Sequence, residues 1–137
     1  MSTGPLNPIL SNRLRMMLQA STSLDALALV SMDGLEIASA LPPGVNGARM
    51  AAMTLASFTL GEQIARELDR RKLQEVYVKG TGGFIVLMPL KNKAVLIALS
   101  RLGAKTGLVL LEMRRVAADL MRPFPASPHT LKQNIHP

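Results

Sequence analysis

Residues 29–41, LVSMDGLEIASAL, place an Asp-Gly pair between two apolar stretches. Asp33 and Gly34 both tolerate the positive φ angles of a two-residue hairpin turn, so we expect positive φ at both positions. The apolar residues on either side are typical of strands. This stretch therefore predicts two strands, at 26–32 and 35–40, that pair in antiparallel fashion around a tight turn.

Helix caps, apolar spacing and turn residues predict further helices and strands on both sides of the hairpin. Asn7-Pro8 is typical of a helix N-terminus, and apolar residues then recur at helical spacing. Short connections separate the apolar segments after residue 75, which favours antiparallel neighbours there as well. The predicted elements in chain order are a helix at 8–20, strands at 26–32 and 35–40, a helix at 47–70, strands at 75–79, 83–89 and 94–100, and a helix at 105–121.

Three of the predicted strands, at 27–32, 84–89 and 94–99, are apolar on both faces. An antiparallel sheet with one wet face would alternate apolar and polar residues instead. The sheet must therefore be covered on both sides, by two helices on one face and one on the other. The predicted fold class is α/β (α+β), in the order α-β-β-α-β-β-β-α, with a five-stranded antiparallel sheet.

The length of 137 residues suits one compact domain. We expect an N-terminal arm at 1–7, a folded domain at 8–121, and a flexible Pro-rich tail at 122–137. The chain has no cysteine, no apolar run long enough for a membrane span, and no basic start followed by an apolar block. A cytoplasmic protein is expected.

The net charge of +7 raises the question of nucleic acid or another anionic partner. The basic residues are scattered, however, and the one tight run, at 70–72, ends the predicted long helix, where it suits the helix dipole. Stacking aromatics are nearly absent, with three Phe, one Tyr and no Trp. Nucleic-acid binding is therefore not expected.

Each candidate motif for catalysis, cofactor binding or metal binding lacks a residue or a structural context that its chemistry requires. Both histidines lie in the Pro-rich tail. The Gly-rich stretch 79–83 links strand to strand, whereas a phosphate cradle needs a strand-to-helix turn. Gly103-Ala104-Lys105-Thr106 lacks the glycine that a Walker motif carries before its lysine. The sequence predicts no catalytic, cofactor-binding or metal-binding residue, and hence no enzyme.

The predicted long helix is apolar on more sides than a helix that covers one sheet face requires. One stripe on its helical wheel comprises Met50, Met53, Ser57, Leu60, Ile64 and Leu68, and a second comprises Ala51, Leu55, Phe58 and Ala65. We expect the first stripe to face the sheet and the second to be exposed in a monomer. Alternatively, neighbouring loops or helix ends bury Leu55 and Phe58.

An exposed second apolar stripe predicts a protein–protein interface. The small residues of the same helix would allow a helix of another chain to approach closely. The strand that follows the helix adds unpaired backbone groups if it lies at a sheet edge. The predicted dimer interface comprises Ala51, Leu55, Phe58, Ala65, Val76, Tyr77, Val78 and Lys79.

Three stretches together resemble the Roadblock/LC7 domain family, over residues from about 8 to 121. They are LDALALVSMDGLEIASA, AAMTLASFTLGEQIARELD, and QEVYVKGTGGFIVLMPL followed by AVLIALSRLGAKTGLVLLEMRRVA. The resemblance is to small free-standing prokaryotic members. It implies that the first and last helices share one face of the sheet, and that two copies pair through the middle helix and the strand after it.

The resemblance also implies a function. Such proteins are non-enzymatic partners of small Ras-like GTPases, as activators or scaffolds, and in gliding-motility relatives the dimer accelerates GTP hydrolysis. The expected function is thus a homodimeric module that binds and regulates a small Ras-like GTPase. The alternative is a small-molecule or peptide sensor of PAS-like or profilin-like architecture, which would need polar groups pointing into a roomy core.

Overall fold

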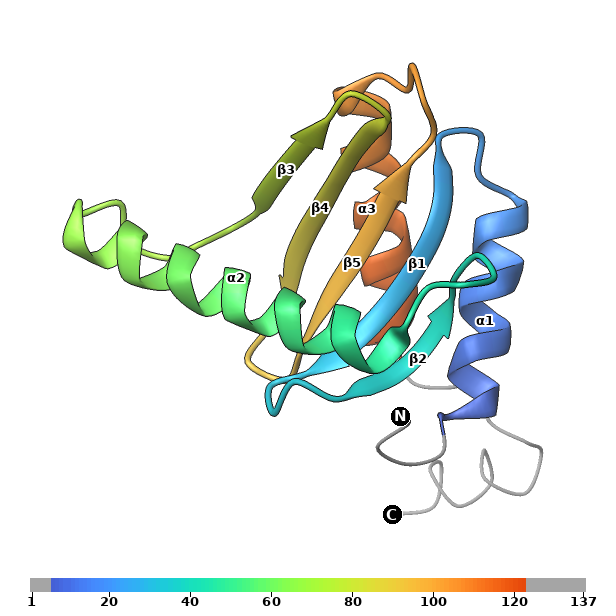
Figure 1. Ribbon diagram of the computed structural model, residues 1–137, viewed down its shortest axis with the longest axis horizontal. Helices are drawn as coiled ribbons and strands as arrows, with labels where there is room; N and C mark the ends of the chain where they lie inside the picture. Colours follow the sequence, from blue (N-terminus) through green and yellow to red (C-terminus); the bar gives the residue numbers. More distant parts are fainter. Residues whose placement is uncertain (1–5, 123–137) are drawn as a thin grey trace, which may run out of the picture.

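The computed structural model describes residues 6–122 (Figure 1). The predictions for most of the N-terminal arm and for the Pro-rich tail from residue 123 lie outside the described residues. The elements follow the predicted order closely. They are α1 (Pro8–Gln19), β1 (Leu24–Ser31), β2 (Glu36–Ala40), α2 (Gly47–Glu67), β3 (Val76–Gly80), β4 (Gly83–Leu90), β5 (Ala94–Ser100) and α3 (Thr106–Met121).

The five strands form one antiparallel sheet in the spatial order β2-β1-β5-β4-β3. Two local units, the β1–β2 hairpin and the β3–β4–β5 meander, join through β1 and β5, where Leu29 lies opposite Leu96. This arrangement leaves β2 and β3 at the two edges. The predicted fold class is confirmed.

Both faces of the sheet are covered, as the apolar strands predicted. α1 and α3 share one face, where Leu14 of α1 and Val109 and Met113 of α3 are fully buried in the larger core cluster. α2 covers the opposite face, where Phe58 packs in a smaller cluster with Val95 and other strand residues. Two helices on one face and one on the other is thus the observed layering (Figure 1).

The hairpin at Asp33-Gly34 differs in detail from the prediction. Only Gly34 has a positive φ, of 81°, and the Ser31 N–H donates to the Leu35 carbonyl across a three-residue loop. A three-residue loop of this kind carries glycine at its last, left-handed position, and it introduces a bulge. The prediction of positive φ at Asp33 was therefore wrong, although the turn lies where it was expected.

The orientation of α2 reverses the predicted one. Ala51, Phe58 and Ala65 are buried against the chain's own sheet, together with Thr54, whereas Leu60 is 56% exposed. Exposed large side chains on this helix are those of Met53, Leu60, Ile64 and Leu68. The prediction that Ala51, Phe58 and Ala65 lie on the outer side of α2 was wrong.

The reason lies in side-chain size. Strand residues beneath α2, such as Val95 and Ile97, are large and branched. A helix approaches such a surface closely when its inner side carries alanine, because close packing matches volumes rather than hydrophobicity alone. Phe58 is the large buried side chain that α2 contributes to the smaller core cluster, and Met50 of α2 packs against the same cluster while partly buried.

One carboxylate fastens α3 to the turn between α1 and β1. Glu112 accepts hydrogen bonds from the hydroxyl groups of Ser21, Thr22 and Ser23, and from the backbone N–H of Thr22 and Ser23. Partial burial alone would raise the pKa of Glu112, but the two serine hydroxyls and the backbone donors outweigh it and lower the pKa to about 2. Arg13 adds a second tie between the helices, through Asp119 at 3.1 Å.

The lowered pKa predicts a pH dependence of stability. A carboxylate with a depressed pKa stabilises the fold fully above its ordinary pKa of 4.5, and this contribution is lost as the pH falls toward 2. Glu112→Gln should lower the free energy of unfolding at pH 7 by roughly 1–2 kcal/mol. Urea denaturation between pH 7 and pH 3 should show the gap to wild type narrowing below pH 4.5. A gap that stays constant with pH would contradict the assignment.

The buried position of Phe58 predicts a large effect of its truncation. Phe58→Ala should lower the free energy of unfolding by about 3–5 kcal/mol, because it opens a cavity in the smaller core cluster. Leu102→Ala, at a residue that is 74% exposed, should change it by less than about 0.5 kcal/mol. Chemical denaturation of both variants provides the measurement, and equal stabilities would show that Phe58 is not a core residue.

Candidate self-association surface

The β2 edge of the sheet is closed by the chain itself. The backbone N–H of Asn7 donates to the Ile37 carbonyl at 2.9 Å, and the Ser39 N–H donates to the Ser11 hydroxyl at 3.1 Å. Asn7, the N-cap of α1, and Ser11 within α1 thus satisfy the Ile37 carbonyl and the Ser39 N–H at this edge. A covered edge is a common way to prevent further strand addition.

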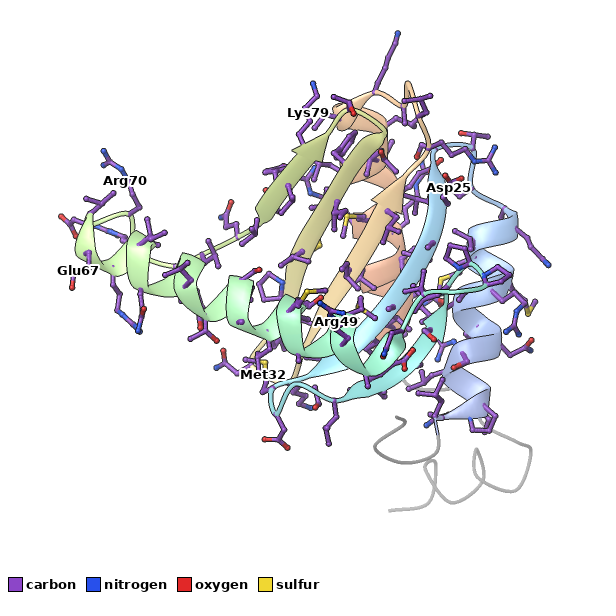
Figure 2. All side chains as sticks on the ribbon, in the orientation of Figure 1. Asp25, Met32, Arg49, Glu67, Arg70 and Lys79 are labelled. Atoms are coloured by element: carbon purple, nitrogen blue, oxygen red, sulfur yellow. The ribbon has the colours of Figure 1, made fainter. Side chains whose placement is uncertain are left out.

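The β3 edge is open. β3 pairs with β4 alone, and Tyr77 and Val78 are 46% and 49% exposed. Lys79 lies toward the far end of this strand, and no described helix covers the edge (Figures 1 and 2). Among the described residues, β3 is therefore the place where the sheet can be extended.

α2 presents an exposed apolar surface next to this edge. We call Met53, Ser57, Leu60, Ile64 and Leu68 the α2 seam. Their spacing of three and four residues is typical of helices that pack along one another. The C-terminal half of α2 reaches beyond the sheet, and Glu67 and Arg70 mark its protruding end (Figures 1 and 2). A helix that projects with large apolar side chains exposed is typical of a protein interface.

The sheet face beneath α2 is covered incompletely near the same edge. Val78 lies opposite Ile85 on β4, and Ile85 in turn lies opposite Leu99 on β5. Val78 is exposed, and the other two are only partly buried. The α2 seam, the β3 edge and this uncovered part of the sheet together form one open corner of the molecule.

Polar contacts on β3 lie on the face shared with α3. The Tyr77 hydroxyl donates to a Glu75 carboxylate oxygen at 3.3 Å. Burial raises the pKa of the Tyr77 hydroxyl, and the Glu75 carboxylate raises it further, whereas the positive charge of Arg114 on α3 opposes both. Tyr77 is thus uncharged at neutral pH and acts as a hydrogen-bond donor.

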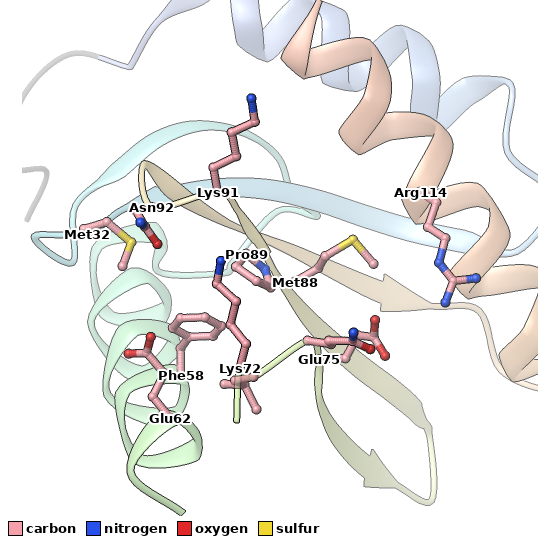
Figure 3. A pocket seen from close by; sticks show the side chains of 12 residues that line it. Met32, Phe58, Glu62, Lys72, Glu75, Met88, Pro89, Lys91, Asn92 and Arg114 are labelled. Carbon is pink, nitrogen blue, oxygen red and sulfur yellow. The ribbon is translucent and has the colours of Figure 1, made fainter. Parts of the chain in front are cut away.

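A surface pocket of about 540 Å³ lies just before the start of β3 (Figure 3). It forms because β3 begins at Val76, opposite Leu87, so that Met88 and Pro89 of β4 have a neighbouring strand only on the β5 side. Lys72, Lys91 and Arg114 stand around it with Glu62 and Glu75, and Phe58 forms part of its wall. These charges are of both signs, and the lining contains no histidine or cysteine.

The structure separates the predicted interface residues into two groups. Ala51, Phe58 and Ala65 belong to the core, and Val76 is partly buried against the smaller core cluster. Tyr77, Val78 and Lys79 are exposed on the open corner, whereas Leu55 is half-buried away from it, and the role of these four residues in dimerisation stays a prediction. Leu55 lines a shallow groove of about 440 Å³ between α2 and the hairpin turn at Gly34.

Sequence reasoning missed the α2 seam as an outer surface, although it grouped these residues with Met50 in one stripe. Met50 alone of that stripe packs against the smaller core cluster, as predicted for a sheet-facing residue. The three- and four-residue spacing of the stripe was visible, but spacing does not say which of two apolar stripes faces the sheet. The small size of Ala51 and Ala65 was the available signal, because small residues mark the side of closest approach.

Other classes of site receive no support from the described residues. Within residues 6–122, His, Cys, Asp and Glu do not gather in groups of three that could hold a metal ion. None of the described helices combines the length and apolar character needed to cross a membrane.

Comparison with known proteins gives consistent results. A model of the Roadblock/LC7 domain matches residues 13–100. The Methanocaldococcus jannaschii protein MJ1340 is 28% identical over 113 residues, which cover 82% of this chain and 98% of the relative. Among solved structures, Myxococcus xanthus MglB is similar with a TM-score of 0.70 at 17% identity, over 82% of each chain.

A Roadblock/LC7 domain from Streptomyces avermitilis is similar with a TM-score of 0.72 at 19% identity, over 80% of this chain and 92% of that one. At such identities the structural likeness shows a shared fold. The family match covers well over half of the chain and includes the whole sheet from β1 to β5. This chain belongs to the Roadblock/LC7 domain family.

Proposed function

We propose that the chain is a homodimeric interaction module that binds and regulates a small Ras-like GTPase in the cytoplasm, without catalytic residues of its own. The observation that carries the proposal is the open corner, where an unpaired strand edge lies beside exposed apolar side chains of the α2 seam. Such a combination is typical of an association surface rather than of an active site.

A second copy is the occupant that this corner suits best. Strand β3 of a second copy would continue the sheet, and its projecting α2 would lie along the first α2 over the uncovered sheet face. Each chain offers both parts, a projecting helix and an uncovered face, so that a twofold arrangement uses both at once. The GTPase part of the proposal rests on membership of the Roadblock/LC7 family, whose resemblance implies GTPase partners.

The sensor alternative lacks a comparable observation. Both core clusters consist of apolar side chains, and no buried side-chain nitrogen or oxygen of the described residues lacks a hydrogen-bond partner. A ligand-binding core would instead present polar groups to an internal cavity.

The homodimer is tested by Leu60→Asp. The wild-type chain should scatter light as a particle of twice its mass of 14.7 kDa at micromolar concentration. Leu60→Asp should shift the particle toward one chain mass, because a charge in an apolar interface weakens association by on the order of 2 kcal/mol or more. Circular dichroism should remain that of a folded protein, because Leu60 is outside the core.

The matched control is Leu102→Asp, which adds the same charge at an exposed leucine in the β5–α3 connection. This variant should remain dimeric. A dimer that survives Leu60→Asp would place the interface elsewhere, and a monomeric wild-type chain would exclude the proposed homodimer.

Regulation of a GTPase is tested separately. The purified chain should neither bind nor hydrolyse GTP. It should change the GTP hydrolysis or nucleotide exchange rate of a small Ras-like GTPase of the same organism, or co-purify with it, and Leu60→Asp should weaken this effect. Stoichiometric GTP binding by the chain alone would contradict the proposal, as would the absence of any effect across the organism's Ras-like GTPases.

A further inference from the structure

The open strand and the residue before it have a self-complementary sequence. Residues 75–79 read Glu-Val-Tyr-Val-Lys, with Tyr77 at the centre, a valine on each side, and opposite charges at the two ends. In antiparallel pairing of two identical strands, a residue before the centre lies opposite the residue equally far after it. Two copies centred on Tyr77 therefore bring unlike charges together at both ends.

We propose that two copies of this chain join their β3 strands in an antiparallel register centred on Tyr77, which places Glu75 opposite the partner subunit's Lys79. This inference rests on the proposed homodimer and adds to it the register and the residues that select it. The twofold axis then passes beside Tyr77, and the charged pair occurs twice in each dimer.

Backbone hydrogen bonding supports the register. The Phe84 N–H donates to the Ser100 hydroxyl on the β5 side at 2.9 Å, so this N–H points away from β3. Lys79 lies opposite Phe84 and is therefore not hydrogen-bonded to it, which leaves the N–H and carbonyl of Lys79 directed to the open edge. By alternation, Tyr77 also directs its backbone groups outward, and so would Glu75 if the strand continues to it in the dimer.

This alternation restricts how a second β3 strand can pair. Outward-directed groups must lie opposite outward-directed groups, so a residue with an odd number pairs only with an odd-numbered partner residue. A one-residue slip from the centred register, such as Val76 opposite the partner subunit's Tyr77, is excluded. Allowed registers keep Val76 and Val78 on the α2 face in both copies, so that both α2 seams lie on the same side of the joined sheet.

Side-chain charge then distinguishes among the allowed registers. A register centred on Lys79 or on Glu75 places like charges opposite each other. One centred on Val78 moves Glu75 opposite the partner subunit's Thr81 in the hairpin turn, and one centred on Val76 moves Lys79 opposite the partner subunit's Leu73. The register centred on Tyr77 alone joins Glu75 to a lysine, and cross-strand pairs of opposite charge stabilise antiparallel sheets.

Self-complementarity also bears on partner choice. If a related chain carried the same charge at both ends of this strand, its pairing with the present chain in this register would place one pair of like charges opposite each other. The sequence of this strand therefore favours pairing with an identical copy over pairing with such a relative.

Cross-linking tests the register directly, because the chain has no natural cysteine. Tyr77→Cys should form a covalent dimer under mild oxidation, since directly opposite residues have Cα atoms about 5.5 Å apart, within disulfide range. Val78→Cys should not, because the two copies of residue 78 would be ~8 Å apart, beyond the range of about 7 Å. Non-reducing gels give the readout.

The outcomes separate the register from the homodimer itself. Cross-linking of Val78→Cys without Tyr77→Cys would overturn the register and favour a centre at Val78. Cross-linking of neither variant, with a wild-type dimer by light scattering, would overturn β3 pairing while leaving the homodimer standing. A monomeric wild-type chain would overturn both.

Charge exchange tests the paired ends. Glu75→Lys and Lys79→Glu should each raise the dimer dissociation constant roughly tenfold at low salt, because each creates two like-charged pairs. An equimolar mixture of the two variants should recover wild-type association, and so should the double variant. Lys93→Glu, which changes the net charge as Lys79→Glu does but lies away from β3, should have little effect. A mixture no tighter than its components would overturn the charged pair.

Discussion

The pairing of β1 with β5 is the interaction on which the rest of the structure depends. It joins a hairpin and a three-stranded meander that are each local in the sequence, and it places Leu29 opposite Leu96 at the centre of the sheet. Almost every residue of the two strands is buried. Burial of this apolar area offsets the entropy of closing a long loop, which contains α2, and it creates two apolar faces that helices must cover.

The two faces and the two edges are completed unequally. α1 and α3 cover one face and are tied to each other and to the α1–β1 turn by Arg13 and Glu112. α1 also closes the β2 edge. The opposite face has α2 alone, which projects past the sheet, and β3 has no outer neighbour. The open sheet edge and the less covered face thereby meet at one corner, whose groups are mainly apolar side chains and backbone amides. Such groups favour association over catalysis.

At this corner the surrounding structure determines how the short strand β3 can pair with a second copy. Residues 75–79 are self-complementary in sequence wherever they lie in a fold. This complementarity can act in assembly because β3 pairs with β4 on one side only and its other side is open. The hydrogen bond from Phe84 to Ser100 then indicates which residues of β3 direct their backbone groups to that open side. Backbone direction limits the registers, and charge selects among them.

Local features of the sequence determined the order of elements, because turn residues, helix caps and apolar periodicity act over a few neighbouring residues. Strands that are apolar on both faces likewise required a covered sheet, and the position of the turn at Gly34 was correct. The orientation of α2 was not accessible in this way. Both stripes are apolar, and only the shape of the sheet beneath them shows that Ala51, Phe58 and Ala65 fit against it while the α2 seam does not. The tertiary structure also decided which edge stays open, because strand order depends on the contact between β1 and β5, which lie far apart in the chain, and on the position of α1 beside β2.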